Sequence, residues 1–246
     1  MEIPNQEIDV VKLFYEGIWG SEHGKRLKEI GDELNKVRNY ANEMIVDDLL
    51  SKTIVHLTLS AYFAGVVPII RIEAALFVEK EFRNEYAYAL ALRAYIEVAG
   101  RLHKGMRLWR QYRANRKTLD ELSNGVARLM AKYRPLKNSP SGIFISKEGG
   151  FNVMSLVQSL EDKIPDITET YDHVSSYVHG GFEEQMFLRK QAWISELKQE
   201  PNPIIKNLEE EAAKLRAVAF DDFSELLQIT RPLRERYDDR HPDDKQ

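Results

Sequence analysis

Apolar residues recur at spacings of three and four along most of the chain, which is the pattern of helices buried on one side. The clearest case is residues 22–45, where one face would carry Leu27, Ile30, Leu34, Val37, Tyr40, Ala41 and Met44. Related patterns predict further helices over 6–19, from Asp47 or Asp48 to about Gly65, from Pro68 to about 82, and over 84–116, 119–133, 151–164, 166–179, 182–199 and 204–229. Because no strands alternate with these helices, the sequence predicts an all-α multi-helix bundle around one core.

The same pattern suggests three regions. Residues 1–45 are expected to form an N-terminal helical extension and residues 46–230 the main helical domain. Residues 231–246, "RPLRERYDDRHPDDKQ", have few apolar groups and two prolines, so a disordered polar tail is predicted there. Residues 134–150 contain two prolines and three glycines and are predicted to be a loop.

Composition narrows the function classes. The chain has 246 residues, of which 43% are hydrophobic and 30% charged, with a net charge of −4. This balance is that of a globular protein and not of a generic nucleic-acid binder, so nucleic-acid binding would need a local basic patch. No cysteine is present, which excludes disulfides, thiolate zinc sites and thiol catalysis.

The most apolar stretch is residues 54–70, "IVHLTLSAYFAGVVPII". It contains His56, Ser60 and Pro68, and Lys52 and Arg71 flank it, so it is interpreted as two buried helix segments broken near Pro68 and not as a membrane span. The N-terminus shows no basic and apolar leader pattern, and a cytoplasmic location is expected.

Several common catalytic motifs are missing from the sequence: GxxxxGK[ST], GxGxxG, GxSxG, HExxH and the EF-hand loop. Their absence argues against nucleoside triphosphate hydrolysis, dinucleotide redox chemistry and metalloprotease activity. No pair of histidines stands at metal-ligand spacing, so neither a metal site nor a cofactor is expected.

Two short constellations carry candidate chemistry. In "LALRAYIEVAGRLH", residues 90–103, Arg93 and Glu97 are four residues apart, so they share one face of the long helix, and mostly apolar residues surround them. Such a pair is either an ion pair at the edge of the core or a polar site inside the bundle.

In "YDHVSSYVHGG", residues 171–181, Tyr171, Ser175 and His179 form a stripe on one helix. Histidine in the last turn followed by glycine is an ordinary helix end. The alternative is that His179 acts as a general base or acid, since histidine titrates near neutral pH.

Taken together, the R-x3-E and Y-x3-S-x3-H-G motifs resemble those of a group of uncharacterised bacterial helical proteins that looks like part of the HEPN superfamily. The match covers about residues 45–195 in helix order, and its specific positions are Arg93, Glu97, Tyr171, Ser175 and His179. The resemblance implies an all-α, often dimeric protein and a metal-independent ribonuclease of the toxin–antitoxin or phage-defence kind. It further implies that Arg93 steadies phosphate charge and His179 moves the proton of the RNA 2′-hydroxyl, while Tyr171 and Ser175 orient the site.

One departure from the family pattern matters. Catalytic HEPN proteins carry R-x4–6-H on a single helix, and no arginine stands at that spacing before His179. Either Arg93 replaces this arginine from another helix, or the chain is a non-catalytic relative.

A basic segment follows the first constellation. Residues 101–117, "RLHKGMRLWRQYRANRK", hold seven Lys or Arg and no Asp or Glu. Cations at every third residue wind around a helix, so part of the row should face protein or partner acids. The candidate nucleic-acid contacts are Lys104, Arg107, Arg110, Arg113 and Arg116; the alternative is a solvated helix with salt bridges.

The sequence therefore predicts metal-independent RNA cleavage or RNA binding in a toxin or phage-defence role. RNA, a second copy of the chain in a homodimer, and an antitoxin or defence protein are the expected partners, and no membrane is. The alternative is a non-catalytic helical module for dimerisation or protein interaction.

Overall fold

The computed structural model describes residues 21–43, 48–130, 150–179 and 202–241, with only the backbone described for Val178 and His179. Every regular element in these ranges is helical, which confirms the all-α prediction. The elements are α2 (Glu22–Glu43), α3 (Leu49–Ala61), η1 (Tyr62–Val66), α4 (Val67–Glu81), α5 (Glu85–Arg113), α6 (Leu119–Met130), α7 (Val153–Val157), η2 (Gln158–Leu160), α8 (Ile167–His179) and α10 (Pro203–Asp238). The helices predicted over 6–19 and 182–199, and the predicted loop up to residue 149, lie outside the described residues.

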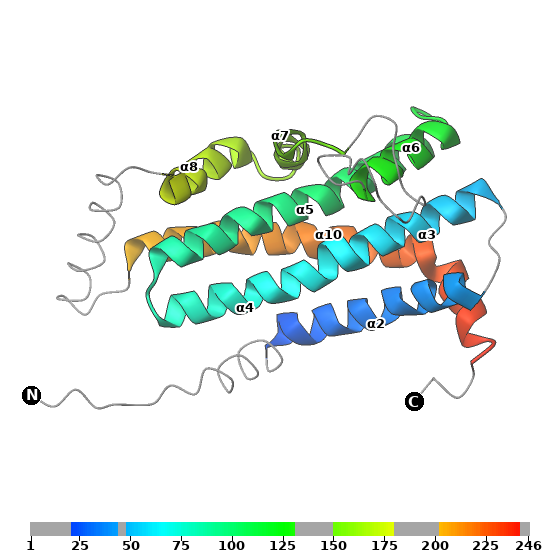
Figure 1. Cartoon of the computed structure of the whole chain (residues 1–246), viewed down its shortest axis with the longest axis horizontal. Coiled ribbons are helices and arrows are strands. Elements are labelled where there is room, and N and C mark those ends of the chain that lie inside the picture. The colour runs from blue at the N-terminus through cyan, green and yellow to red at the C-terminus, as the bar shows by residue number, and fades with distance from the viewer. Residues whose placement is uncertain (1–20, 44–47, 131–149, 180–201, 242–246) are drawn as a thin grey trace, which may run out of the picture.

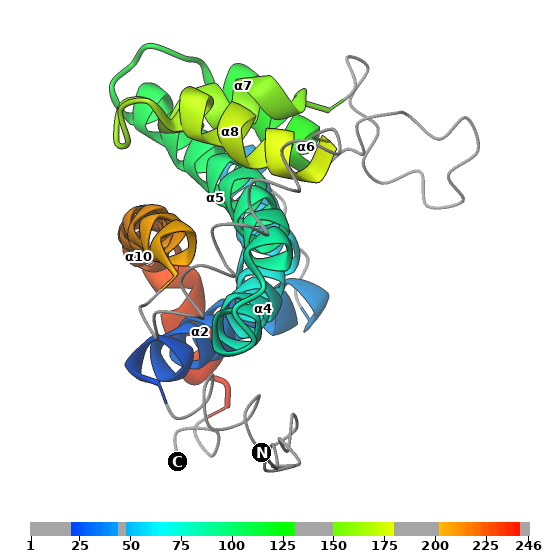
Figure 2. The same ribbon diagram turned by 90° about the vertical axis from the view of Figure 1, so that its left-hand side faces the viewer.

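Helix α5 runs through the middle of the molecule. Helices α6, α7 and α8 cover one side of it, and α4 and α10 cover the other (Figures 1 and 2). The sequence explains this position, because α5 carries apolar residues around most of its circumference. The residues of α5 that are at most 1% exposed include Ala89, Leu92, Tyr95, Ile96, Ala99 and Met106.

Short polar side chains fix the starts of several helices. The carboxylate of Asp48 accepts a hydrogen bond from the backbone N–H of Ser51 at 2.7 Å, as the sequence predicted for a start at Asp47 or Asp48. Helices α5, α7 and α10 begin in the same way at Asn84, Asn152 and Asn202.

Gly100 allows α7 to lie close to α5. A Cβ at this position would be 2.5 Å from the carbonyl oxygen of Leu156. The hydroxyl of Ser159 lies 3.0 Å from the Gly100 carbonyl oxygen and 2.6 Å from that of Leu156. This side-chain bonding competes with a regular helix, and the helix predicted over 151–164 is wrong beyond Val157, where η2 and turns replace it.

The break expected near Pro68 is also wrong, because α3, η1 and α4 form one continuous helix, Leu49–Glu81. Element η1 is a π turn in which the N–H of Val67 bonds to the carbonyl of Tyr62. This wider turn relieves the clash between a proline ring and the carbonyl four residues earlier. By length and composition the helix could cross a membrane, as many core helices of soluble proteins could, and half of its most apolar window is buried inside the protein.

Helices α2 and α10 depart from the predicted regions. Leu27, Ile30 and Leu34 of α2 share one hydrophobic core with α5 and α10, so α2 packs as part of the bundle. Helix α10 continues eight residues past the predicted boundary at 230, and the polar tail predicted from 231 is therefore helical up to Asp238. Leu233 and Tyr237 stabilise this extension, because both are buried in a second cluster with α2 and α3.

Candidate functional site

The two motif halves meet between α5 and α8. The phenol of Tyr171 donates a hydrogen bond to the Glu97 carboxylate at 2.8 Å and accepts one from Nε of Arg93 at 3.4 Å. Arg93 and Glu97 also form an ion pair at 3.5 Å, and the guanidinium lies 5.5 Å from the centre of the Tyr171 ring. Residues from helices more than 70 positions apart thus form one polar cluster, which we call the α5–α8 cluster: Arg93, Glu97 and Tyr171.

The electrostatics of the α5–α8 cluster keep the phenol neutral and the guanidinium charged. Burial is the main cause that raises the pKa of Tyr171; the Arg93 guanidinium lowers it, and the Glu97 carboxylate raises it again. The hydrogen bond that Arg93 donates to the Tyr171 phenol oxygen is the main cause that raises the pKa of Arg93. The side chains of Arg93 and Glu97 are 24% and 35% exposed, so solvent and a ligand can reach both.

Ser175 and His179 lie farther along α8. The Ser175 hydroxyl, one turn beyond Tyr171, is buried and has no hydrogen-bond partner among the described residues. His179 ends α8, and its side chain lies outside the described part of the chain. At 1.5 Å per residue, the backbones of Tyr171 and His179 are about 12 Å apart along the helix.

The cations of the basic segment do not share one surface. Arg101 donates to the carbonyl of Leu129 at 3.1 Å, and burial lowers its pKa. Arg110 points to α10 and bonds to acids there. Arg113 and Arg116 are exposed near the end of α5. The expected winding of the row around the helix is what the structure has.

Lys104 and Arg107 line a pocket of about 470 Å³ between α5 and α6. Lys117 and Arg128 line it as well, and we call these four cations and their surroundings the α5–α6 pocket. The ring of Phe151 closes one side, with Nζ of Lys104 at 5.2 Å and Cζ of Arg128 at 4.3 Å from its centre. Burial lowers the pKa of Lys104, and the three neighbouring cations lower it further.

A charged network that joins α5 to α10 was not predicted from the sequence. His103 is fully buried, and its ring nitrogens lie 2.8 Å from a carboxylate oxygen of Asp222 and 3.0 Å from one of Asp162. Both contacts are hydrogen bonds only when both nitrogens carry protons. Arg110 bonds to Asp222 at 2.6 Å and to Glu225 at 2.8 Å. The available signal was Asp222 within "AVAFDDFSELL", where it stands between the apolar residues Ala219, Phe220 and Phe223.

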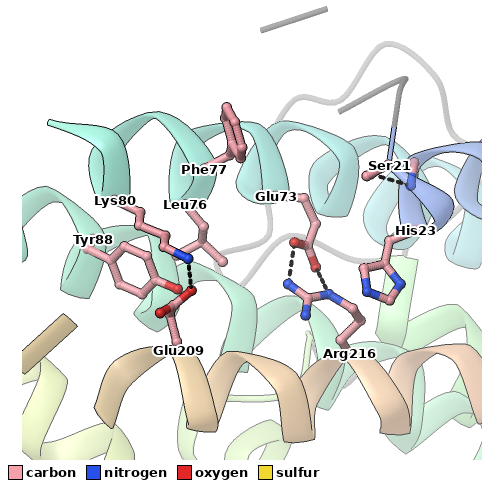
Figure 3. A pocket seen from close by; sticks show the side chains of 10 residues that line it. Ser21, His23, Glu73, Leu76, Phe77, Lys80, Tyr88, Glu209 and Arg216 are labelled. Carbon is pink, nitrogen blue, oxygen red and sulfur yellow. Dashed lines mark hydrogen bonds and ion pairs between the residues drawn. The ribbon is translucent and has the colours of Figure 1, made fainter. Parts of the chain in front are cut away.

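A second charged pocket, of about 150 Å³, lies between α4 and α10 (Figure 3). Arg216 donates two hydrogen bonds to Glu73, at 2.6 and 2.8 Å, and Tyr95 donates a third at 2.9 Å. Lys80 forms an ion pair with Glu209 at 2.6 Å. The charges drawn in Figure 3 are therefore satisfied by one another, and this pocket has the features of a structural crossing between helices.

Within the described residues, no three or more His, Asp or Glu side chains are grouped to hold a metal ion. No family model, curated protein or solved structure matches this chain. The functional argument therefore rests on the residues themselves.

Proposed function

We propose that this protein binds RNA and cleaves it without a metal ion at the α5–α8 cluster, in a toxin or phage-defence role. The observation that supports this proposal is the meeting of Arg93, Glu97 and Tyr171 in one partly exposed hydrogen-bonded group. These three residues are among the specific positions of the HEPN-like motifs in the sequence.

Each residue has a chemical role in this proposal. His179 accepts the proton of the RNA 2′-hydroxyl, whose oxygen attacks the adjacent phosphorus and displaces the 5′-oxygen. The partly exposed guanidinium of Arg93 stabilises the negative charge that grows on the phosphate oxygens. Tyr171 and Glu97 hold Arg93 through the contacts described above and are positioning residues.

The geometry adds a condition to the mechanism. Arg93 contacts Tyr171, whose backbone is about 12 Å from that of His179 along α8. The two groups reach one phosphate either through extended side chains or across a homodimer interface. The second arrangement is part of the proposal, since the resemblance implies a dimer.

A non-catalytic interaction module is the second candidate. Phe82, Tyr86 and Leu90 are 40–48% exposed around the turn between α4 and α5, one to three turns before Arg93. Exposed apolar side chains grouped in this way are typical of protein interfaces. In this alternative the α5–α8 cluster contributes to stability alone, because Arg93 and Glu97 already satisfy each other.

An RNA-degradation assay in EDTA distinguishes the ribonuclease from the non-catalytic interaction module. Purified wild type, Arg93→Ala, His179→Ala and the control Arg71→Ala, an exposed arginine on α4, are compared on a mixed RNA pool. The proposal predicts cleavage by wild type and the control, and a loss of at least a hundredfold in the other two variants with unchanged thermal melts. If wild type cleaves no RNA, the interaction module is favoured.

Mixing Arg93→Ala with His179→Ala tests the dimer arrangement. If each active site uses Arg93 from one subunit and His179 from the other, a mixed dimer regains one intact site. Cleavage that returns on mixing supports the composite site. Variants that are inactive alone and remain inactive after confirmed subunit exchange place both groups within one subunit.

A further inference from the structure

Among the described residues, the lining of the α5–α6 pocket has more positive than negative charges. Four cations line it: Lys104, Arg107, Lys117 and Arg128. Arg107 is exposed and makes no ion pair with an acid among the described residues. Burial is the main cause that lowers the pKa of Lys104, and the neighbouring cations Arg107, Arg128 and Lys117 lower it further.

Among the described residues, one acid, Glu121, lines the pocket, and its carboxylate is held by hydrogen bonds to a neighbouring residue. The Glu121 carboxylate accepts hydrogen bonds from the backbone N–H of Thr118 at 2.7 Å and from its hydroxyl at 3.2 Å. Thr118 in turn accepts from the N–H of Glu121 at 3.2 Å, which completes a capping box at the start of α6. Glu121 is held at the helix start, and the pocket keeps a net positive lining.

Size and lining chemistry indicate the ligand. A volume of about 470 Å³ is within the range of small-molecule sites and larger than one phosphate group needs. Asn124 and Gln111 add side-chain amides, which donate and accept hydrogen bonds. Lysines and arginines around one cavity are the groups that bind successive phosphates of a chain.

We propose that the α5–α6 pocket binds the 5′-triphosphate group of a nucleotide, either free or at the 5′ end of an RNA. The pocket is separate from the α5–α8 cluster, because Arg93 and Arg107 are about 21 Å apart along α5. Only the RNA source of the ligand rests on the proposed function. The free nucleotide would bind whether or not the protein cleaves RNA.

Calorimetric titration of the full chain with inorganic triphosphate, ATP and AMP in EDTA tests the ligand class. We expect triphosphate and ATP to bind at least tenfold more tightly than AMP, since AMP presents one phosphate. Arg107→Gln and Lys117→Gln should each weaken ATP binding at least tenfold, and Arg71→Gln should leave it unchanged. Both pocket variants change side chains at the solvent boundary and introduce a polar amide in place of the charge, so folding is expected to persist; melts of each variant check this.

A second titration distinguishes the two sources. It compares ATP with a ten-nucleotide RNA that carries either a 5′-triphosphate or a 5′-hydroxyl, using Arg93→Ala so that no cleavage intervenes. Binding of the triphosphorylated RNA at least tenfold more tightly than ATP assigns the pocket to RNA ends. Equal or tighter binding of ATP assigns it to free nucleotides.

Three results would overturn the inference: no binding of triphosphate or ATP by wild type, equal affinity for AMP and ATP, or unchanged affinity in both Arg107→Gln and Lys117→Gln. Failure of the cleavage proposal is separate. If Arg93→Ala loses cleavage but still binds ATP, both the cleavage proposal and the triphosphate proposal are supported. If wild type binds ATP but cleaves no RNA, only the triphosphate proposal is supported.

Discussion

The two sides of α5 differ in how their charged side chains are paired. On the side of α10, Glu73 is paired with Arg216, and Asp222 with Arg110 and His103, at distances of 2.6–2.8 Å. On the side of α6, four cations and one acid of the described residues line a pocket, and that acid, Glu121, is held in its capping box.

We infer from this difference that the charges on the side of α10 stabilise the fold and that those on the side of α6 bind a ligand. A buried carboxylate with several donors is part of the folded structure, and its removal leaves those donors unsatisfied. Cations gathered around one cavity repel one another, and such a group is expected where an anion binds. The predictions below remove charges from each side, from the largest expected effect to the smallest.

Asp222→Ala should have the largest effect on stability. The side chain is 1% exposed and bonds to His103 and Arg110, so its loss leaves a buried imidazole and a guanidinium without their shared acceptor. We expect the free energy of unfolding to fall by about 3–5 kcal/mol in urea denaturation. The neighbouring exposed Asp221→Ala is the matched control and should change it by less than about 0.5 kcal/mol. Equal effects of the two substitutions would contradict the structural role of Asp222.

Glu73→Gln should have the next largest effect. The amide keeps the size of the side chain but loses the charge that holds both nitrogens of Arg216, whose side chain is 22% exposed. We expect a loss of roughly 2 kcal/mol, because partial exposure lets water replace some of the contact. Glu81→Gln, at an exposed position of the same helix, is the control. A loss as small as that of the control would mean that the pair in Figure 3 adds nothing to stability.

Tyr171→Phe should cost less, about 1 kcal/mol, because one hydrogen bond to a partly exposed carboxylate is lost. The proposed function predicts a larger effect on cleavage, since Arg93 would lose its positioning contact. Single-turnover cleavage in EDTA alongside urea denaturation measures both. A proportional small loss in both quantities would assign Tyr171 to stability alone.

Lys104→Met should raise stability slightly in the absence of ligand, by roughly 0.5 kcal/mol. The substitution keeps the contact area of the stem and removes a charge that Arg107, Arg128 and Lys117 repel. Urea denaturation measures the change, with the exposed Lys28→Met as the control. A loss of stability would mean that the contact of Lys104 with Phe151 outweighs the repulsion.

The difference in the free energy of unfolding between wild type and Lys104→Met should depend on pH with a definite sign. The pKa of Lys104 is lower in the folded protein than its ordinary 10.5, so between these two values the unfolded chain binds more protons. Wild type should therefore gain stability relative to Lys104→Met as the pH rises toward 10.5 through that window. Below the folded pKa the difference should be constant.

The sequence predicted much of the fold, because local spacing determines which face of a helix is apolar. The face predicted from Leu27 to Tyr40 is buried, and the long helix predicted over 84–116 is Glu85–Arg113. The predicted helix boundaries were wrong where contacts between residues distant in sequence determine them. The contact of Ser159 with Gly100 ends the helix at α7. Leu233 and Tyr237 extend α10 by packing on α2 and α3.

The candidate site was predicted in part for the same reason. The spacings of Arg93 with Glu97, and of Tyr171 with Ser175, placed each pair on one helix face. Spacing did not indicate that Arg110 faces acids of α10 while Arg107 faces a pocket beside α6. His103 was missed because its two acids are 59 and 119 residues away in the sequence.

The most direct test of the comparison is the thermal midpoint of wild type and of Lys104→Met, each with and without saturating inorganic triphosphate. Without triphosphate, we expect Lys104→Met to be slightly more stable than wild type. With triphosphate, we expect wild type to be more stable than the variant by several degrees. The reason is that a ligand at a hundredfold excess over Kd stabilises the protein that binds it by about 2.7 kcal/mol. An equal shift of both proteins by triphosphate, or no shift in either, would contradict the claim that the cations of the α5–α6 pocket await an anion.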